Sequence, residues 1–193
     1  MEDMVLRPSV SRIFDEYLVA SARACDATAF SRLAENWQRR LLAHAYRLTG
    51  DPELARDVVQ DGWADIVRGF PGLKEPSVFP AWAYRIITRR AADAIGRAQR
   101  KRRTEAAYAA EPEAKDISAS KIEMQADSSP LHLAIEALPA KQRSVIALYY
   151  LEEFSITEIS VALSVPAGTV KTRLMHARTK LRAHLDGGNN AQK

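Results

Sequence analysis

Residues 155–185 read SITEISVALSVPAGTVKTRLMHARTKLRAHL, two apolar-periodic segments separated by a short interruption. Ser155 precedes the first segment and Glu158 follows three residues later, which is the spacing of a capping box. The interruption contains Pro166, which suits the first turn of a second helix because proline lacks the N–H that would be unpaired there. This part of the chain therefore predicts two helices joined by a tight turn.

The second of these helices is amphipathic, and its charge is of one sign. Apolar residues recur at steps of three and four from Val170 to Leu185, so they form one stripe. Cations occupy much of the remaining surface, and no acidic residue occurs between Pro166 and Leu185. A capped short helix followed by a purely cationic helix is typical of a DNA-binding helix-turn-helix. A basic helix alone would fit a solvated face, so the prediction depends on the combination.

The whole chain has the composition of a globular protein with one medium domain or two small ones. It has 193 residues, of which 47% are hydrophobic and 27% charged, and a net charge of +4. The single cysteine, Cys25, excludes an internal disulfide and fits a reducing compartment; we expect its thiol to be buried or half-buried. No segment has the apolar length of a signal peptide or a membrane span, so we expect a cytoplasmic protein without membrane insertion.

The sequence offers no candidate for catalysis, metal binding or cofactor binding. No nucleophile motif, metal cluster or glycine-rich phosphate loop occurs. The histidines show no ligand spacing; they are His44, His132, His176 and His184. We therefore expect no enzymatic activity, no metal and no cofactor.

Charge changes sign along the chain, which indicates separate surfaces for separate partners. A helix is predicted from Pro52 to Phe70 with Asp51 as its N-cap, and residues 51–67 hold five acids against one arginine. The phosphates of DNA would repel this acidic surface, so we expect it to face solvent or to bind a basic protein partner. Residues 85–103 instead hold eight basic residues and one acid. Cations at this density repel one another unless anions neutralise them. The phosphate backbone of a nucleic acid is the usual anionic partner of such a segment.

The basic segment is predicted to begin a helix at Pro80, after a loop from Pro71 to Pro80 that is rich in proline. The inward side of this helix is predicted to carry Trp82, Ile86, Ile95 and either Ala92 or Asp93. The outward side is predicted to carry Arg85, Arg89, Arg90, Arg97 and the cations of residues 100–103.

Composition divides the chain into two small helical domains, so the predicted fold class is all-α. Residues 1–103 form the first domain, a helical bundle that starts near residue 11. Residues 104–130 hold six acids against two lysines and end in a proline, which predicts a flexible acidic linker. Residues 131–193 form the second domain, in which helices over 131–138 and 141–151 build a small core under the helix-turn-helix.

Motifs in both domains resemble bacterial RNA polymerase sigma factors. LPAKQR (138–143) and the stretch from residue 155 to residue 178 resemble region four, ARDVVQD (55–61) resembles region 2.2, and WAYRI (82–86) with Asp93 resembles region 2.4. Region four alone is shared with response-regulator activators, so the pairing with region 2.2 is the more specific signal. Both regions stand in order without a third domain between them, which is the layout of the extracytoplasmic-function (ECF) group. The resemblance covers roughly residues 30–185.

The resemblance implies a factor that binds core RNA polymerase and promoter DNA. It implies docking on the clamp helices of the polymerase β′ subunit through Asp57, Gln60 and Asp61. The implied minus-ten contacts are Lys74, Trp82, Arg85, Arg89, Arg90 and Arg97, with the loop from residue 71 to residue 80 capturing a flipped base. The implied minus-thirty-five contacts are Lys171, Thr172, Arg173, Met175, His176, Arg178 and Lys180. The polymerase β flap and an anti-sigma factor are further implied partners.

The chain departs from the family pattern at three places. Arg89 stands where the family usually has asparagine, which would alter the preferred minus-ten bases. Met175 and His176 stand where arginine is common, and an imidazole discriminates bases less strongly than a bidentate guanidinium. Ser164 replaces the usual turn glycine, at a position where a positive φ is expected.

Two other hypotheses remain open from the sequence alone. A sigma-like mimic would sequester an anti-sigma protein without binding DNA, but it should have lost outward cations such as Arg85 and Lys171. A stand-alone helix-turn-helix activator would leave the acidic surface at Asp57 and Gln60 without a partner.

Overall fold

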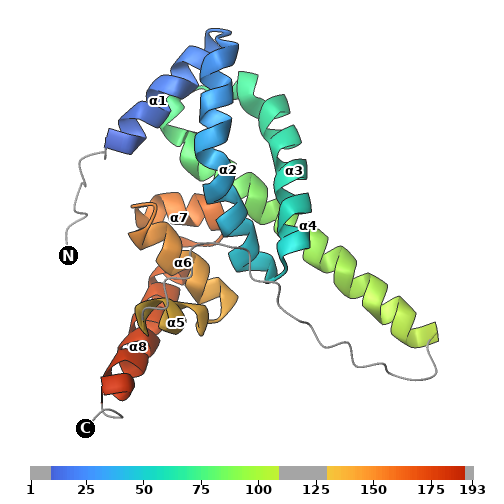
Figure 1. The fold of residues 1–193 in the computed structure, drawn as a ribbon, viewed down its shortest axis with the longest axis vertical. Helices are drawn as coiled ribbons and strands as arrows, with labels where there is room; N and C mark the ends of the chain where they lie inside the picture. Colours follow the sequence, from blue (N-terminus) through green and yellow to red (C-terminus); the bar gives the residue numbers. More distant parts are fainter. Residues whose placement is uncertain (1–9, 109–129, 190–193) are drawn as a thin grey trace.

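The computed structural model describes residues 10–108 and 130–189, so most of the predicted linker lies outside the described residues. Within those ranges the chain is helical and contains no strand, which confirms the all-α prediction (Figure 1). The helices and two 3-10 turns are α1 (Val10–Arg23), α2 (Ala27–Thr49), α3 (Pro52–Gly69), η1 (Phe70–Gly72), η2 (Pro76–Val78), α4 (Phe79–Tyr108), α5 (Pro130–Glu136), α6 (Ala140–Tyr150), α7 (Ile156–Leu163) and α8 (Ala167–Asn189).

Helices α1 to α4 form the first module, which packs around aromatic side chains. Trp37 of α2 is fully buried, and its ring meets those of Phe79 and Tyr84 edge to face at centroid distances of 5.2 and 5.7 Å. Edge-to-face contacts add to the free energy of burial because the positive ring edge meets the negative ring face. These contacts join α2 to the beginning of α4 and so fix the orientation of the basic helix.

The turn between α2 and α3 is fixed by its local sequence. Gly50 ends α2 in the left-handed conformation, with φ of 71°, which glycine adopts without strain. The Asp51 side chain accepts hydrogen bonds from the backbone amides of Glu53 and Leu54, and Pro52 occupies the first turn. The N-cap predicted from the sequence is therefore confirmed.

Helices α3 and α4 approach closely at Gly62. A Cβ atom at this position would lie 2.3 Å from Cδ1 of Ile87, so any larger residue would require the Ile87 side chain to move. The close approach places Asp57 and Asp61 of α3 beside Arg90 and Arg97 of α4.

Helices α5 to α8 form the second module, which contains the predicted helix-turn-helix. Ser155 and Glu158 form a complete capping box at the start of α7, as the sequence predicted. Ser164 ends α7 with φ of 53°, so the predicted positive φ is also confirmed. The Ser160 hydroxyl donates a hydrogen bond to the Val165 carbonyl at 2.6 Å, which braces the turn before α8.

The two modules contact each other, which the sequence did not predict. Helix α7 packs against α4, and α6 packs against α2 (Figure 1). At the centre of the contact the buried ring of Phe154, just before α7, meets the ring of Tyr84 at a centroid distance of 5.5 Å. The helix-turn-helix is thus held against the basic helix of the first module.

Several expectations from the sequence are wrong in detail. Cys25 is exposed in the turn between α1 and α2 rather than buried. Helix α4 continues to Tyr108, so residues 104–108 of the predicted linker are helical, while the domain boundaries themselves stay a prediction. Its buried side is formed mainly by small and aromatic residues, namely Ala83, Tyr84, Ile87, Ala91 and Ala94, and not by the predicted stripe. In the described ranges no helix is long and apolar enough to cross a membrane.

Candidate nucleic-acid and polymerase interface

Helix α8 presents a narrow exposed face between two rows of cations. Val170, Leu174 and Ala177 are buried against the second module. Successive residues of an α-helix turn by about 100°, so the opposite side is centred on Thr172, Met175 and His176, all of which are exposed. One edge of this face carries Lys171 and Arg178, and the other carries Arg173 and Lys180. Such an arrangement suits a groove whose two walls are phosphate backbones.

Two tyrosines of α6 hold Arg178 in place. Its Nε donates a hydrogen bond to the Tyr150 hydroxyl at 2.9 Å. Its guanidinium lies over the rings of Tyr149 and Tyr150, at 5.2 and 5.6 Å from the two centroids. The Arg178 side chain remains exposed while so held, so it can meet an anion at a fixed position.

Trp82, Arg85 and Arg89 share one side of α4, because they lie three and four residues apart. Both arginines are exposed, and the half-buried Trp82 lies against Phe79 at a ring distance of 6.1 Å. Lys74 is exposed between η1 and η2, where its carbonyl accepts a hydrogen bond from Arg23 at 2.7 Å. A ring and several cations beside a short loop suit an unstacked nucleic-acid strand.

Arg90 and Arg97 lie on a different side of α4, turned toward α3. Nε of Arg90 lies 2.5 Å from a carboxylate oxygen of Asp65, and its Nη1 lies 4.0 Å from Asp61. The hydrogen bond from Arg90 lowers the pKa of Asp65 below its usual value. The prediction that Arg90 faces outward with Arg85 is therefore wrong.

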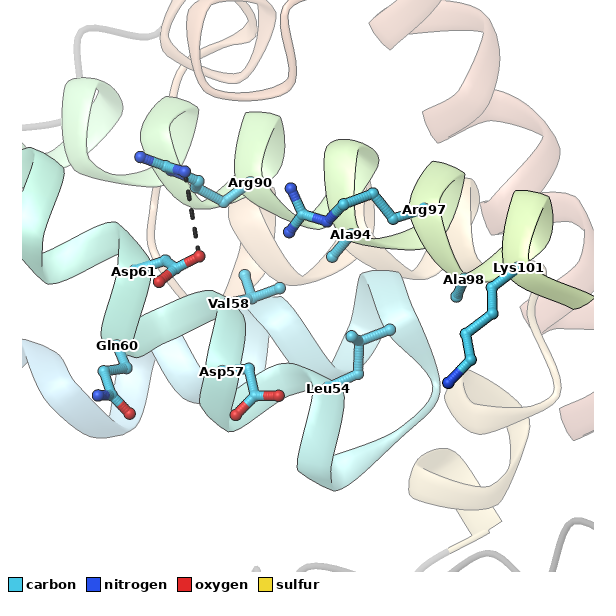
Figure 2. Close-up of a pocket in the computed structure, with 10 residues that line it drawn as sticks. All are labelled: Leu54, Asp57, Val58, Gln60, Asp61, Arg90, Ala94, Arg97, Ala98 and Lys101. Atoms are coloured by element: carbon cyan, nitrogen blue, oxygen red, sulfur yellow. Dashed lines mark ion pairs between the residues drawn. The ribbon is translucent and has the colours of Figure 1, made fainter.

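A groove of about 630 Å³ lies between α3 and α4 beside their contact, with an acidic wall from α3 and a basic wall from α4 (Figure 2). The wall from α3 contains Asp57, Gln60 and Asp61, and all three side chains are exposed. The wall from α4 contains Arg90, Arg97 and Lys101. The structure thus brings the three predicted polymerase contacts together on one exposed side of α3.

The groove was not predicted from the sequence, because all cations of α4 were predicted to lie on one outward side of the helix. The spacing of Arg90 and Arg97, seven residues apart, already placed them on one side of a helix. At 3.6 residues per turn, Arg85 and Arg89 point in a different direction from Arg90 and Arg97. Within the described ranges, no group of three or more His, Cys, Asp or Glu side chains is arranged to hold a metal ion.

Comparisons with known proteins match each of the two modules to a family. The family described as Sigma-70 region 2 matches residues 33–101, and Sigma-70, region 4 matches residues 128–181. The chain is 28% identical over 173 residues to the ECF RNA polymerase sigma factor SigW of Bacillus subtilis, covering 83% of this chain and 90% of that protein. It is 28% identical over 188 residues to the ECF RNA polymerase sigma-E factor of Escherichia coli, covering 86% of this chain and 92% of that protein.

Two solved structures have the same fold. CnrH, in complex with the cytosolic domain of CnrY, is 27% identical with a TM-score of 0.57 and covers 90% of this chain and 98% of its own. The sigma factor RpoE, in complex with the anti-sigma factor NepR from Bartonella quintana, is 22% identical with a TM-score of 0.62 and shows the fold alone. It covers 81% of this chain and 96% of its own.

Both sigma regions therefore occur in order along one chain. Sigma factors bind core RNA polymerase and promoter DNA and are not enzymes; the polymerase performs the chemistry of transcription. The chain belongs to the sigma-70 family, as an ECF-type sigma factor that directs transcription from specific promoters.

Proposed function

We propose that α8 reads the minus-thirty-five element through the major groove. Thr172, Met175 and His176 would face base edges, and the cations on both edges of the helix would contact phosphates. The Thr172 hydroxyl donates to the Gly168 carbonyl at 3.0 Å, so it offers its methyl group and lone pairs to a base. The observation that carries the proposal is the acid-free exposed face of α8 between Lys171 and Arg178 on one edge and Arg173 and Lys180 on the other.

The proposed minus-ten surface is the side of α4 that carries Trp82, Arg85 and Arg89, together with Lys74 in the preceding turn. Stacking of an unpaired base on an aromatic ring is worth about 1–3 kcal/mol, and the adjacent cations would hold the strand. We assign Arg90 and Arg97 to the contact between α4 and α3, because both line the groove there.

Asp57, Gln60 and Asp61 are the proposed contacts to the clamp helices of the polymerase β′ subunit. Their exposure on one side of α3 supports this assignment, since an acidic surface would bind a basic protein better than DNA. The second module would contact the β flap. An anti-sigma factor is a further proposed partner, because the similar sigma factor RpoE was solved in complex with the anti-sigma factor NepR. With core RNA polymerase as its partner, the protein would act in the cytoplasm.

Replacing His176 with arginine is expected to change which minus-thirty-five bases are preferred and to leave the minus-ten preference unaltered. A guanidinium can bond two acceptors of a guanine at once, and one such pair discriminates between bases by about 1–3 kcal/mol. Selection from a pool of randomised promoters, with holoenzyme as the bait, measures both preferences. His184→Arg is the matched control, because His184 is an exposed residue of the same helix outside the proposed base-contacting face. Identical selected sequences for the His176 variant and the wild type would remove this residue from the DNA interface.

A further inference from the structure

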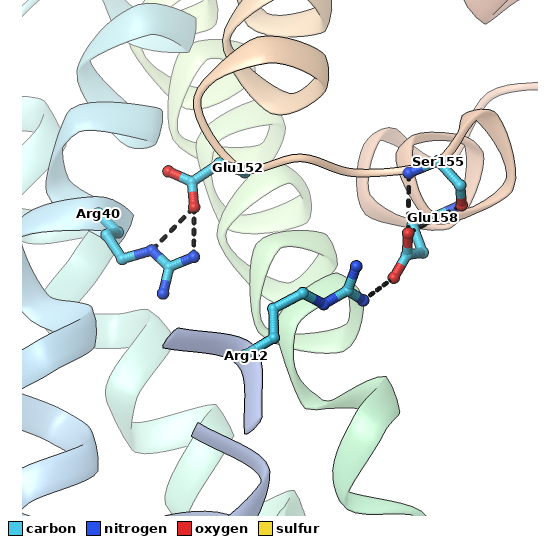
Figure 3. A network of polar contacts seen from close by, with 5 residues as sticks. All are labelled: Arg12, Arg40, Glu152, Ser155 and Glu158. Atoms are coloured by element: carbon cyan, nitrogen blue, oxygen red, sulfur yellow. Dashed lines mark hydrogen bonds and ion pairs between the residues drawn. The ribbon is translucent and has the colours of Figure 1, made fainter. Parts of the chain in front are cut away.

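Two arginines of the first module are each held in place by a carboxylate. Nε and Nη2 of Arg40 donate hydrogen bonds to Glu152 at 2.8 and 2.5 Å, and Arg12 forms an ion pair with Glu158 (Figure 3). The carboxylate that fixes each guanidinium also neutralises its charge. These two arginines therefore have little remaining attraction for an external anion.

Arg178 of α8 is held differently, by two uncharged aromatic side chains of α6. Its Nε donates a hydrogen bond to the Tyr150 hydroxyl, and its guanidinium lies over the rings of Tyr149 and Tyr150. Among the residues that the structure describes, Arg178 forms no ion pair. Unlike Arg12 and Arg40, this arginine is therefore fixed in position while its full charge remains available.

The hydrogen bond to Tyr150 decides which part of the Arg178 side chain can meet an anion. Nε is occupied by the tyrosine, whereas Nη1 and Nη2 form no hydrogen bond within residues 10–108 and 130–189. These two terminal nitrogens lie side by side in the plane of the guanidinium. They can therefore bind two oxygens of one phosphate at the same time, which a lysine ammonium at this position could not do.

The Tyr150 hydroxyl also has a hydrogen-bond donor available. A phenol can accept a hydrogen bond at its oxygen and donate one through its own hydrogen. The oxygen of Tyr150 accepts from Arg178, so the hydroxyl hydrogen can be donated to a second acceptor beside the guanidinium. The side chain of Tyr150 is 54% exposed, so an anion from solvent can reach this hydrogen. The tyrosine and the arginine thus offer their donors to the same place.

This pair lies beside a row of cations on α8. Lys171 lies seven residues before Arg178 and Arg182 lies four residues after it, and these spacings keep all three on one side of the helix. All three side chains are exposed. Helix α6 packs against α8, so Tyr150 adds an uncharged donor to this row from a second helix. The phosphates along one strand of DNA are the anions that suit such a row.

We infer that Tyr150 is a DNA-contacting residue that forms, together with Arg178, one binding site for a phosphate beside the minus-thirty-five element. Tyr150 orients the guanidinium through Nε and donates its hydroxyl hydrogen to the phosphate that Nη1 and Nη2 bind. The site distinguishes no base, because the phosphate is the same at every base pair. The inference rests on the proposed function of α8, since it requires the exposed face of that helix to lie against DNA.

Replacing Tyr150 with phenylalanine removes the hydroxyl and keeps the ring. Holoenzyme with this variant should bind all promoters about three- to tenfold more weakly than wild-type holoenzyme, which is the usual range for one lost hydrogen bond. Fluorescence anisotropy measures this binding, with labelled promoter fragments that the wild-type holoenzyme selects from a randomised pool. Tyr17→Phe is the matched control, because Tyr17 is an exposed tyrosine of α1 in the first module; it should bind like the wild type.

A double-mutant cycle tests whether the tyrosine and the arginine act as one site. Arg178→Ala should weaken binding to all promoters and lower the salt slope by about one, because one phosphate contact is lost. In that background Tyr150→Phe should weaken binding by less than about twofold, since the phosphate is no longer held beside the hydroxyl. An equal loss in both backgrounds would overturn the inference. So would unchanged binding by Tyr150→Phe alone, or a changed base preference in that variant.

Lys171→Ala separates this inference from the proposed function, because Lys171 lies in the same row of cations but outside the proposed site. If both are correct, Lys171→Ala, Arg178→Ala and Tyr150→Phe all weaken binding. If the two cation variants weaken binding and Tyr150→Phe does not, α8 contacts DNA and only the role of Tyr150 is wrong. If none of the three variants changes binding, α8 does not contact DNA, and the proposed function fails together with the inference.

Discussion

Replacing Asp57 with arginine and Gln60 with alanine in one variant is expected to abolish binding to core RNA polymerase. Both side chains are exposed on α3, so the change should leave the hydrophobic core intact. A like charge facing its partner costs several kcal/mol in a protein interface, and about 1.4 kcal/mol corresponds to a tenfold change in affinity. Affinity should therefore fall by more than a hundredfold. Gel filtration of an equimolar mixture with core polymerase measures the loss.

The control for this variant is Glu35→Arg, the same reversal of charge at an exposed position on α2. It should form holoenzyme like the wild type, and circular dichroism should show equal helical content in all three proteins. Normal holoenzyme formation by the double variant would show that α3 does not carry the polymerase contact.

Stability should fall as the pH drops below about 6.5, because one histidine is buried without charge. His44 is fully buried between α2 and α4, and its Nε2 lies 2.9 Å from the Thr88 hydroxyl. Burial, with a smaller effect of the cation Arg47, lowers the pKa of His44 to about 3. The unfolded chain binds this proton near pH 6.5, whereas the folded protein does not. The folded state therefore loses stability through the whole window between the two values.

The expected loss follows from the two pKa values. Each pH unit inside the window costs about 1.4 kcal/mol, so the free energy of unfolding at pH 5 should be about 2 kcal/mol lower than at pH 7.5. Urea unfolding at both pH values measures this difference. His44→Gln removes the titrating group but keeps a polar side chain, so its stability should depend much less on pH. Equal pH dependence in the variant and the wild type would show that His44 is not the group responsible.

The helix-turn-helix was predictable because each of its signals is local. The capping box of Ser155 and Glu158, the break at Pro166 and the apolar stripe of α8 all lie within one stretch of chain. Turn chemistry and helical period need no knowledge of the rest of the fold, which is why the positive φ of Ser164 could also be anticipated. The same holds for Asp51 and the start of α3.

The buried side of α4 was mispredicted because its packing depends on small residues. Ala83, Ala91 and Ala94 give a weak apolar signal in the sequence, yet they let neighbouring helices approach closely. The larger residues Trp82 and Ile86 were predicted to form the buried side, but they are only half-buried. Because the buried side was predicted in the wrong direction around the helix axis, Arg90 was predicted to face outward, and the groove beside α3 was not predicted.

The ion pairs between the two modules, Arg40 with Glu152 and Arg12 with Glu158, could not be predicted, because their partners are far apart in the sequence. Arg40 and Glu152 are separated by 112 residues, and Arg12 and Glu158 by 146. Each would be an ordinary surface charge in an isolated module. Only the relative placement of the modules pairs them, and no local pattern encodes that placement.

The most direct test of promoter-specific function is run-off transcription with purified core polymerase on fragments of genomic DNA. Core polymerase with this protein should produce discrete transcripts whose start sites share one upstream pair of sequence motifs, separated by a nearly constant spacing. Core polymerase alone should not produce them. Absence of new transcripts, or transcripts whose start sites share no such pair of motifs, would contradict the conclusion that this chain directs transcription from specific promoters.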